Sequence, residues 1–346
     1  MLKKYRVKND MSQRQRAKKT VLDYYQRLDS TPENTVEDLL SEVMHPEIFW
    51  RGYHPFNEQF GPKAVSDQFW RPLKKALSNL QRRMDIFFAG ENNIEGYKGI
   101  WVASMGHFLG LFDSPWLEIP PTRKIVMLRY GEFNHIVDDK IIETAMFFDI
   151  PHFMMQAGFN PFPPQTGAHL VQPGPMTHNG LVYQSLPDEE GTKTLNAIEF
   201  MIEDSKNWSG GSDEPLVDEL RRSWNEDMIW WGPSGIGATY TIERYAEQHS
   251  GPFRAGFTDR KFNGHVCRIA EGAFGGFFGW PNLTLTPTGG FMGMPGSSKA
   301  ADMRVIDFYR REGEKLTENW VFIDLLHFWK MQGVDILKRM QENSFR

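Results

Sequence analysis

The chain contains one stretch twice. Residues 128–158, LRYGEFNHIVDDKIIETAMFFDIPHFMMQAG, align without a gap with residues 303–333, MRVIDFYRREGEKLTENWVFIDLLHFWKMQG. In each copy two apolar, strand-like runs flank a tight turn, and a short helical pattern follows. This pattern predicts a β-hairpin followed by a short helix at two places in the chain. Nine aligned pairs are identical: Arg129 with Arg304, Phe133 with Phe308, Lys140 with Lys315, Glu143 with Glu318, Phe147 with Phe322, Asp149 with Asp324, His152 with His327, Phe153 with Phe328, and Gly158 with Gly333.

The similarity extends beyond the hairpin to most of the chain. EIFWRG in the first half resembles DMIWWG in the second, and a glycine-rich strand, MGHFLGLFDSPWLEIPPT, aligns with EGAFGGFFGWPNLTLTPT. Two copies of one domain are therefore expected. The matched positions are Trp50 with Trp230, Gly52 with Gly232, Gln68 with Gln248, Pro72 with Pro252, Gly106 with Gly272, Phe108 with Phe274, Gly110 with Gly276, Phe112 with Phe278, Pro115 with Pro281, and Pro121 with Pro287.

The length of the chain agrees with this duplication. Its 346 residues suit roughly two domains of about 150 residues each. Between the two copies the composition shifts to Pro, Gly, Gln and His, as in NPFPPQTG and QPGPMTHNG, which is typical of a connection between domains. We expect a first domain at 1–165, a linker at 166–192 and a second domain at 193–346.

Each half places its helical patterns before its strand-like runs, an order typical of α+β domains. In the first half a helix that begins at Gly61 is interrupted at Pro72, because proline lacks an amide donor. The sequence therefore predicts curved antiparallel sheets packed on N-terminal helices. The expected strands of the first half span 84–89, 100–112, 125–137 and 140–150, and the expected early helices of the second half span 194–204 and a segment through Leu216, Leu220 and Trp224.

Composition argues against several classes of protein. A net charge of -5 offers no basic stripe for nucleic acid. Cys267 is the single cysteine, so neither an intramolecular disulfide nor a cysteine-based structural zinc site is expected. The N-terminus lacks the apolar core of a signal peptide, and no apolar run reaches the ~18 residues that span a bilayer. A soluble, cytoplasmic protein without membrane or nucleic-acid partners is the expectation.

The repeated Asp-x-x-His motif allows two interpretations. Asp149 and His152, like Asp324 and His327, are spaced to share one face of a helix and could together bind a metal. Two ligands per half are too few, and no third ligand follows at ordinary spacing. An aspartate that caps the N-terminus of the following helix is the favoured interpretation. No metal is therefore expected.

Three segments together resemble the SnoaL-like polyketide cyclase family, within the nuclear transport factor 2-like superfamily. They are His45 to Glu47 followed by a strand and GPKAV, the glycine-rich strand leading into Ile119 to Thr122, and the run from Asp138 to Gly158 that contains DDKI, DIP and QAG. The second half matches more loosely. The resemblance implies two tandem cystatin-like α+β cones, each with an apolar cavity for a small hydrophobic molecule. Because such domains commonly pair through their sheets, it also implies an intrachain pseudo-dimer, present as a monomer or a homodimer.

The resemblance also implies a cofactor-free mechanism, in which an aspartate in the cavity moves a proton during ring closure. That aspartate falls on Met146 and Val321, neither of which can move a proton. An assisting histidine of the family falls on Glu132 and Asp307, and a polar asparagine falls on Trp50 and Trp230. The scaffold of the cyclases is therefore kept, while their acid–base set is not.

Glu132 and Asp307 are the candidates to replace the missing acid–base group. A carboxylate among apolar neighbours has a raised pKa and can act as a base near neutrality. Alternatively the carboxylate forms an ion pair with an arginine across the sheet or at the domain interface, for which Arg129, Arg304 and Arg310 are candidates. His107 lies one position before the histidine of many relatives, and a slip of one residue on a strand moves a side chain to the other face.

Two functions follow from these observations. In the first, the chain is a cyclase, isomerase or dehydratase with Glu132 and Asp307 as catalytic residues and no cofactor. In the second, both cavities bind a ligand or a partner without chemistry. In either case the candidate ligand contacts are Trp50, Tyr130, Met146, His107, Trp230, Asn319 and Val321.

Overall fold

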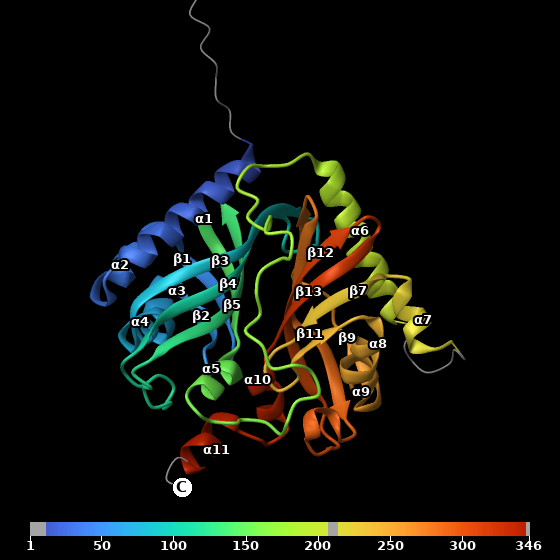
Figure 1. Ribbon diagram of the computed structural model, residues 1–346. Coiled ribbons are helices and arrows are strands. Elements are labelled where there is room, and N and C mark those ends of the chain that lie inside the picture. The colour runs from blue at the N-terminus through green and yellow to red at the C-terminus, as the bar shows by residue number, and fades with distance from the viewer. Residues whose placement is uncertain (1–11, 207–213, 344–346) are drawn as a thin grey trace, which may run out of the picture.

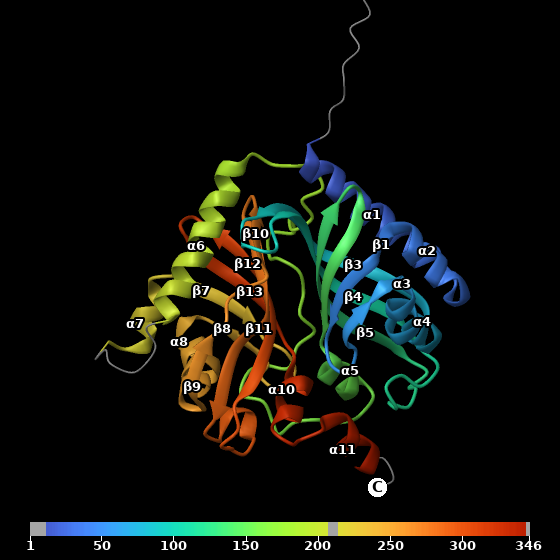
Figure 2. The ribbon, with the colours of Figure 1, turned by 180° about the vertical axis from the view of Figure 1, so that it is seen from behind.

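The computed structural model describes residues 12–206 and 214–343. Two sheets lie in the middle of the molecule and face one another, while α1 and α2 cover the outside of one sheet and α6 and α7 cover the outside of the other (Figure 1). The view from behind shows the same arrangement, with the segment that joins the halves running between the sheets (Figure 2). The expected α+β architecture, with curved sheets packed on helices, is confirmed.

The first half contains one six-stranded sheet in the order β2-β1-β6-β5-β4-β3. All neighbours are antiparallel except β1 and β6, which are parallel, so the sheet is mixed where the sequence predicted an antiparallel one. The elements are α1 Gln13–Ser30, η1 Glu33–Thr35, α2 Val36–Val43, β1 Met44–Gly52, β2 Asn57–Phe60, α3 Gly61–Val65, η2 Ser66–Trp70, α4 Arg71–Ala76, β3 Leu77–Asn92, β4 Gly99–Phe112, β5 Ile125–Val137, β6 Lys140–Phe148 and α5 Ile150–Gln156.

The second half follows a similar order of elements, with β9 and β10 in place of the single strand β3 and with η4 and α11 in addition. Its sheet runs β10-β11-β12-β13-β7-β8, with β9 also paired to β11, and β13 is parallel to β7 as β6 is to β1. The elements are α6 Asp188–Lys206, α7 Leu216–Arg221, β7 Trp224–Trp231, β8 Ala238–Tyr240, α8 Ile242–Tyr245, η3 Ala246–Ser250, α9 Gly251–Ala255, β9 Phe257–Phe262, β10 Cys267–Glu271, β11 Phe274–Pro287, η4 Phe291–Gly293, β12 Ala301–Glu312, β13 Lys315–Ile323, α10 Leu325–Met331 and α11 Ile336–Asn343.

The repeated proline interrupts a helix in both halves. Before Pro72 the helix widens into one π-helical turn, η2, and before Pro252 it widens into η3. A residue without an amide donor cannot complete the regular hydrogen-bond ladder, and π turns of this kind are frequent at functional sites. The interruption predicted at Pro72 is confirmed, and its counterpart shapes the candidate site described below.

The glycine-rich strands do not align as their sequences suggest. Tyr130 on β5 pairs with Gly106 on β4, and the equivalent Val305 on β12 pairs with Gly279 on β11. Gly106 therefore corresponds to Gly279, and its predicted alignment with Gly272 is wrong. Glycine and phenylalanine recur along both strands, so several registers give similar sequence matches while backbone pairing selects one.

The two sheets pack through an apolar seam, defined here as the contact between their facing surfaces. The Phe133 ring lies 5.5 Å from Phe278 and 5.3 Å from Phe308, measured between centroids. Gly131 allows this approach, because a Cβ there would stand 3.0 Å from the rings of Phe308 and Phe322. Burial of such rings removes large apolar areas from water and stabilises the packing of the two halves.

Asp149 and Asp324 connect the halves reciprocally. Each caps the N-terminus of the following helix, accepting from the backbone N–H of His152 or His327, so the capping interpretation is confirmed. The second oxygen of Asp149 accepts from Ser234 N at 3.0 Å in the other half. In the same way Asp324 accepts from His54 N at 2.9 Å. Among the described residues no group of three metal-ligating side chains occurs.

The segment between α5 and α6 runs along the seam and hydrogen-bonds to both sheets. In the first half, Phe87 on β3 donates to Gly180 O at 2.8 Å and accepts from Val182 N at 2.8 Å. In the second half, Trp320 on β13 donates to Pro173 O at 2.9 Å. Among the described helices, none combines the length and apolar character that crossing a bilayer requires.

Candidate functional site

Glu132 and Asp307 occupy the same place in the two halves. Glu132 on β5 lies opposite Met146 on β6, and Asp307 on β12 lies opposite Val321 on β13. Neighbouring residues of a strand point to opposite faces, and Phe133 lies in the seam, so Glu132 points toward the helices. Only 1 % of Glu132 and 6 % of Asp307 is exposed. Both carboxylates therefore lie inside their own half.

In the first half the carboxylate forms a buried ion pair. Arg82 donates from Nη1 to Glu132 Oε2 at 2.6 Å, and Asn134 donates to Oε1 at 3.1 Å. The guanidinium carbon lies 3.6 Å from the ring centroid of Tyr25 and 4.5 Å from that of Tyr130. An arginine stacked between aromatic rings thus fills the space beside Glu132.

The arginines that the sequence suggested as partners have other roles. Arg129 lies in the seam and donates to Val321 O at 3.1 Å, and Arg304 lies 3.6 Å from Asp324. Arg310 forms a buried ion pair with Glu318. The partner of Glu132 is Arg82, which comes from an earlier strand.

In the second half a phenylalanine stands where the first half has Arg82. Residues paired across three neighbouring strands of one half can be matched with those of the other half, and this matching makes Phe262 the counterpart of Arg82. Asp307 therefore receives no guanidinium group from this position. The matching rows of paired residues are Arg82, Phe108 and Leu128 in the first half and Phe262, Leu283 and Met303 in the second.

Asp307 consequently titrates far from the usual range of a carboxyl group. Burial raises the pKa of Asp307 to about 7, since the charged form loses its hydration. Asn319 donates to Oδ1 at 3.2 Å, and this bond, the neighbouring Tyr309 and the positive charge of Arg129 oppose part of the rise in pKa. At neutral pH both the protonated and the ionised forms are populated, as proton transfer requires.

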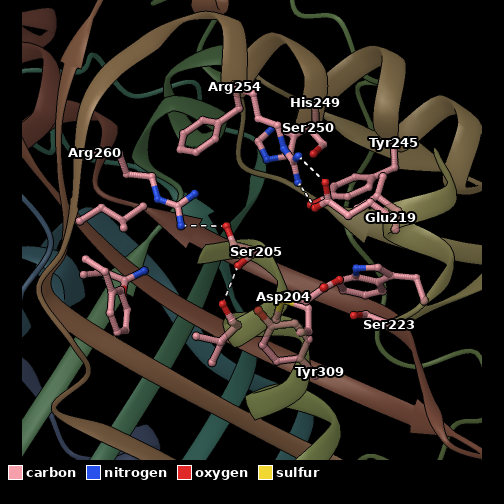
Figure 3. Close-up of a pocket in the computed structure, with 18 of the residues that line it drawn as sticks. Asp204, Ser205, Glu219, Ser223, Tyr245, His249, Ser250, Arg254, Arg260 and Tyr309 are labelled. Carbon is pink, nitrogen blue, oxygen red and sulfur yellow. Dashed lines mark hydrogen bonds and ion pairs between the residues drawn. The ribbon is translucent and has the colours of Figure 1, made fainter. Parts of the chain in front are cut away.

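A cavity of about 200 Å³ lies between the sheet and the helices of the second half. Tyr309, two residues along β12 from Asp307, lines it, and so does Phe277, which is paired with Asp307 across the sheet. Side chains from α6, η3, α9 and β9 line the other sides (Figure 3). Tyr309 both lines the cavity and interacts with Asp307, so it connects the buried carboxyl with this space.

The π-helical turns explain why the second half has space here. The last two residues of η2 are Phe69 and Trp70, and the corresponding residues of η3 are His249 and Ser250. Both phenylalanine and tryptophan are fully packed in the first half, where the Trp70 ring lies 5.9 Å from the guanidinium carbon of Arg82. The smaller Ser250 leaves volume in the second half that Trp70 fills in the first.

His249 is a neutral polar group in this wall. Its ring stacks on Trp230 at 3.7 Å between centroids, as Phe69 stacks on Trp50 at 5.4 Å. Burial lowers the pKa of His249 to about 3, because the protonated ring would lose its hydration. Its Nδ1 is buried without a hydrogen-bond partner in the part of the chain that the structure describes.

The charges around the cavity are largely compensated. Arg254 forms two hydrogen bonds to the carboxylate of Glu219, and Asp204 pairs with Arg222 at 2.8 Å. Arg260 donates to Ser205 O at 2.9 Å (Figure 3). Burial, followed by the like charge of Arg254, lowers the pKa of Arg260.

The candidate residues from the sequence divide into three groups. Asp307, Asn319, Val321 and Trp230 lie on neighbouring strands of the second sheet, beside the cavity wall. In the first half, Trp50, Tyr130 and Met146 lie on the corresponding strands, and Met146 and Tyr130 lie beside the Arg82–Glu132 pair. His107 pairs with Arg129 of the seam and therefore lies on the opposite face of the sheet, where its Nδ1 is 3.2 Å from Asp85.

Sequence reasoning missed His249, Ser250 and Tyr309. A signal for the first two was present, because matching Gln68 with Gln248 places His249 against Phe69 and Ser250 against Trp70. Tyr309 lies opposite Asn134 in the ungapped repeat, and the alternation of a strand places it on the same face as Asp307, although it was not among the candidate site residues.

Part of the chain is similar to known proteins. Residues 217–330 match the family model of the SnoaL-like polyketide cyclase. A search of curated proteins gave no match. Similar solved structures include a SnoaL-like protein from Jannaschia sp. CCS1, with 20% identity over 45% of this chain and 99% of that chain and a TM-score of 0.36. IdmH from Streptomyces antibioticus has 12% identity over 41% of this chain and 99% of that chain, with a TM-score of 0.34.

TsrD from Streptomyces laurentii has 17% identity over 40% of this chain and 96% of that chain, with a TM-score of 0.32. The family match covers α7 to most of α10, which includes β12 with Asp307 and the π-helical turn with His249. Most of the cavity wall lies inside the matched segment, whereas the part contributed by α6 lies before it. Over residues 217–330 the chain is thus similar to the SnoaL-like polyketide cyclase family.

Proposed function

We propose that the second half binds a small organic molecule in the cavity and moves a proton to or from it, without a cofactor. The observation that carries this proposal is Asp307, whose carboxyl has a pKa of about 7 and lies directly behind the wall of the cavity. A group that titrates near the working pH is the most effective acid–base catalyst. The reaction class is enolisation, isomerisation, dehydration or ring closure of a carbonyl compound.

The proton passes through Tyr309 in this mechanism. Burial holds the pKa of the Tyr309 hydroxyl well above its usual value, so this group does not ionise by itself. It accepts the substrate proton while it donates its own proton to Asp307, which leaves Tyr309 neutral and Asp307 protonated. The neutral ring of His249 supplies a hydrogen-bonding group on the opposite wall without adding charge.

The first half has a structural role in this proposal. Its equivalent carboxylate is neutralised by Arg82, and the space beside it is filled by aromatic side chains. Through the seam and the reciprocal bonds of Asp149 and Asp324 it supports the second half. The chain would then contain a duplicated domain with one working copy.

Binding without chemistry is the second candidate function. It is favoured by Val321, which stands at the position where the family resemblance implies the cyclase aspartate and which cannot move a proton. The two functions differ in what Asp307 does. In a binding module its ionisation changes affinity, whereas in an enzyme it changes the rate of proton transfer.

Exchange of acidic C–H protons tests the proposed chemistry. We expect the wild-type protein to accelerate deuterium uptake from D₂O by 2-tetralone, a two-ring ketone, and Asp307→Asn to lower this rate by about 100-fold or more. The rate should rise with pH through the pKa of Asp307, because only the ionised carboxyl accepts a proton. Proton NMR follows the loss of the α-proton signals.

The control for this experiment is Asp227→Asn, the same change at an exposed residue of β7. This variant should exchange protons at the wild-type rate. If Asp307→Asn also kept the wild-type rate, the assignment of Asp307 would be wrong. Binding of 2-tetralone with no acceleration by the wild-type protein would support the binding module.

Closing the cavity gives an independent prediction. Ser250→Trp copies the residue of the first half, and we expect it to abolish binding of 2-tetralone because Trp70 fills this place in the other copy. Isothermal titration calorimetry measures the affinity, and circular dichroism checks that the fold is kept. Ser298→Trp, at an exposed position of the loop before β12, is the control and should keep the wild-type affinity. Unchanged affinity of Ser250→Trp would place the ligand elsewhere.

The remaining expectations from the sequence stay predictions. They are a cytoplasmic location and a monomer or homodimer of the whole chain. The domain limits at residues 165 and 193 also stay predictions. Light scattering measures the oligomeric state, and a stable ring of higher order would contradict the expected intrachain pairing.

A further inference from the structure

The shape and polarity of the cavity restrict its ligand further than the proposed reaction does, and this inference rests on the proposed function of the second half. We infer that the cavity takes an uncharged planar compound of one or two fused rings with a hydroxyl group that donates a hydrogen bond to Asn282. His249 provides the second polar contact of the ligand. Compounds with four fused rings and carboxylates are excluded from the site.

Volume sets the number of rings. An engineered apolar cavity of about 150 Å³ holds one benzene molecule. The cavity beside Tyr309, of about 200 Å³, is therefore large enough for one ring or two small fused rings.

The walls favour a flat aromatic or conjugated ring. Tyr245, Phe253 and Phe277 contribute aromatic surfaces from the helical side and from β11. Aromatic rings prefer offset-stacked or edge-to-face contacts with other rings, and such contacts add to the gain from burial. The Tyr245 ring also lies 5.6 Å from His249, so these residues form one continuous aromatic wall.

His249 Nδ1 and Asn282 Oδ1 are buried polar atoms of this wall, and neither has a hydrogen-bond partner within the described residues. The exposed fractions of the two residues are 8 % and 9 %. A buried polar atom without a hydrogen bond is costly, so such atoms commonly mark the place of a ligand or water. Asn282 Oδ1 only accepts, and it therefore selects a ligand hydroxyl or N–H group.

The charges of the wall argue for a neutral ligand. The cavity is lined by two carboxylates, Asp204 and Glu219, and by two guanidinium groups, Arg254 and Arg260. Glu219 is held by both nitrogens of Arg254, and Asp204 by Arg222 outside the cavity. An anionic ligand would also lie close to Asp307, whose ionisation it would oppose.

Calorimetric titration with four probes tests this inference. We expect 2-naphthol to bind at least 10-fold more tightly than naphthalene, because naphthalene leaves Asn282 Oδ1 unpaired. The anion 2-naphthoate and the four-ring quinone 5,12-naphthacenequinone should show no binding. Equal affinities for 2-naphthol and naphthalene would overturn the role of the hydroxyl, and binding of the four-ring quinone would overturn the size limit.

The variant Asn282→Leu removes the acceptor while it keeps the size of the side chain. It should reduce the affinity for 2-naphthol to that for naphthalene and leave naphthalene unchanged. Asn263→Leu, at an exposed position close by, is the matched control and should keep the preference for 2-naphthol. If Asn282→Leu also kept this preference, the contact with Asn282 would be wrong.

The two proposals fail in different ways. Loss of probe selectivity with normal exchange of 2-tetralone would overturn the ligand class and leave the chemistry of Asp307 intact. Selective binding of 2-naphthol with no proton exchange would keep the ligand class and overturn the enzymatic function. Binding that Ser250→Trp does not weaken would show that the probes occupy another site, which contradicts the inference.

Discussion

The ionisation of Asp307 is expected to lower the free energy of unfolding of the wild-type protein by about 4 kcal/mol as the pH rises from about 4 to about 8. The variant Asp307→Asn should not show this loss. The pKa of Asp307 rises from 3.8 in the unfolded chain to about 7 in the folded protein. The folded state therefore holds this proton more tightly, and its contribution to stability is complete below the unfolded pKa and lost as the pH rises through the folded pKa. Asparagine carries no such proton.

Urea unfolding of both proteins across this pH range measures the effect. The difference between the two free energies of unfolding should change with pH, with the variant gaining relative to the wild type toward high pH. Asp324, whose pKa burial raises to about 6, contributes to both proteins and cancels in the comparison. A constant difference between the two curves would show that Asp307 ionises normally.

Arg82→Met is expected to destabilise the protein by about 3 to 5 kcal/mol. The substitution leaves the buried Glu132 carboxyl group without its partner, and a buried acid that has lost its counter-ion strongly destabilises the fold. The double variant Arg82→Met with Glu132→Gln removes both charges and should recover most of the stability. Urea unfolding of the two single variants and the double variant gives the coupling energy between the residues.

The exposed ion pair of Lys19 and Asp23 is the matched control. Its side chains are 60 % and 53 % exposed, so Lys19→Met should cost less than about 1 kcal/mol. If Arg82→Met cost no more than this, or if the double variant were as unstable as the single one, the buried ion pair would not hold the first half together. The packing around Glu132, and not its ion pair with Arg82, would then stabilise the first half.

Much of the architecture could be predicted because the sequence of one half is repeated in the other. The ungapped repeat identifies the equivalent strands and aligns Glu132 with Asp307. The strand pairing confirms this alignment, because the two residues lie opposite the equivalent residues Met146 and Val321. The capping role of Asp149 and Asp324 was also predictable, because an aspartate before a short helix has a local function. Interactions within a few residues are visible in a sequence.

The difference between the two halves was less predictable, because it depends on residues that meet across strands. Arg82 reaches Glu132 from β3, and the sequence offered three other arginines for this role. The counterpart Phe262 could be identified only through strand register, which a bulge in β11 between Gly279 and Leu283 shifts. The alignment of glycine-rich strands failed for the same reason.

The proposed function depends on Asp307 titrating near neutrality inside the second half. The most direct measurement is the ¹³C chemical shift of its carboxyl carbon, assigned by comparison with Asp307→Asn and followed as the pH rises from about 4 to about 9. We predict a midpoint near 7, and a much lower midpoint in Phe262→Arg, which introduces the guanidinium that the first half has in Arg82. A wild-type midpoint at the ordinary value of about 3.9 would contradict the proposed role of Asp307.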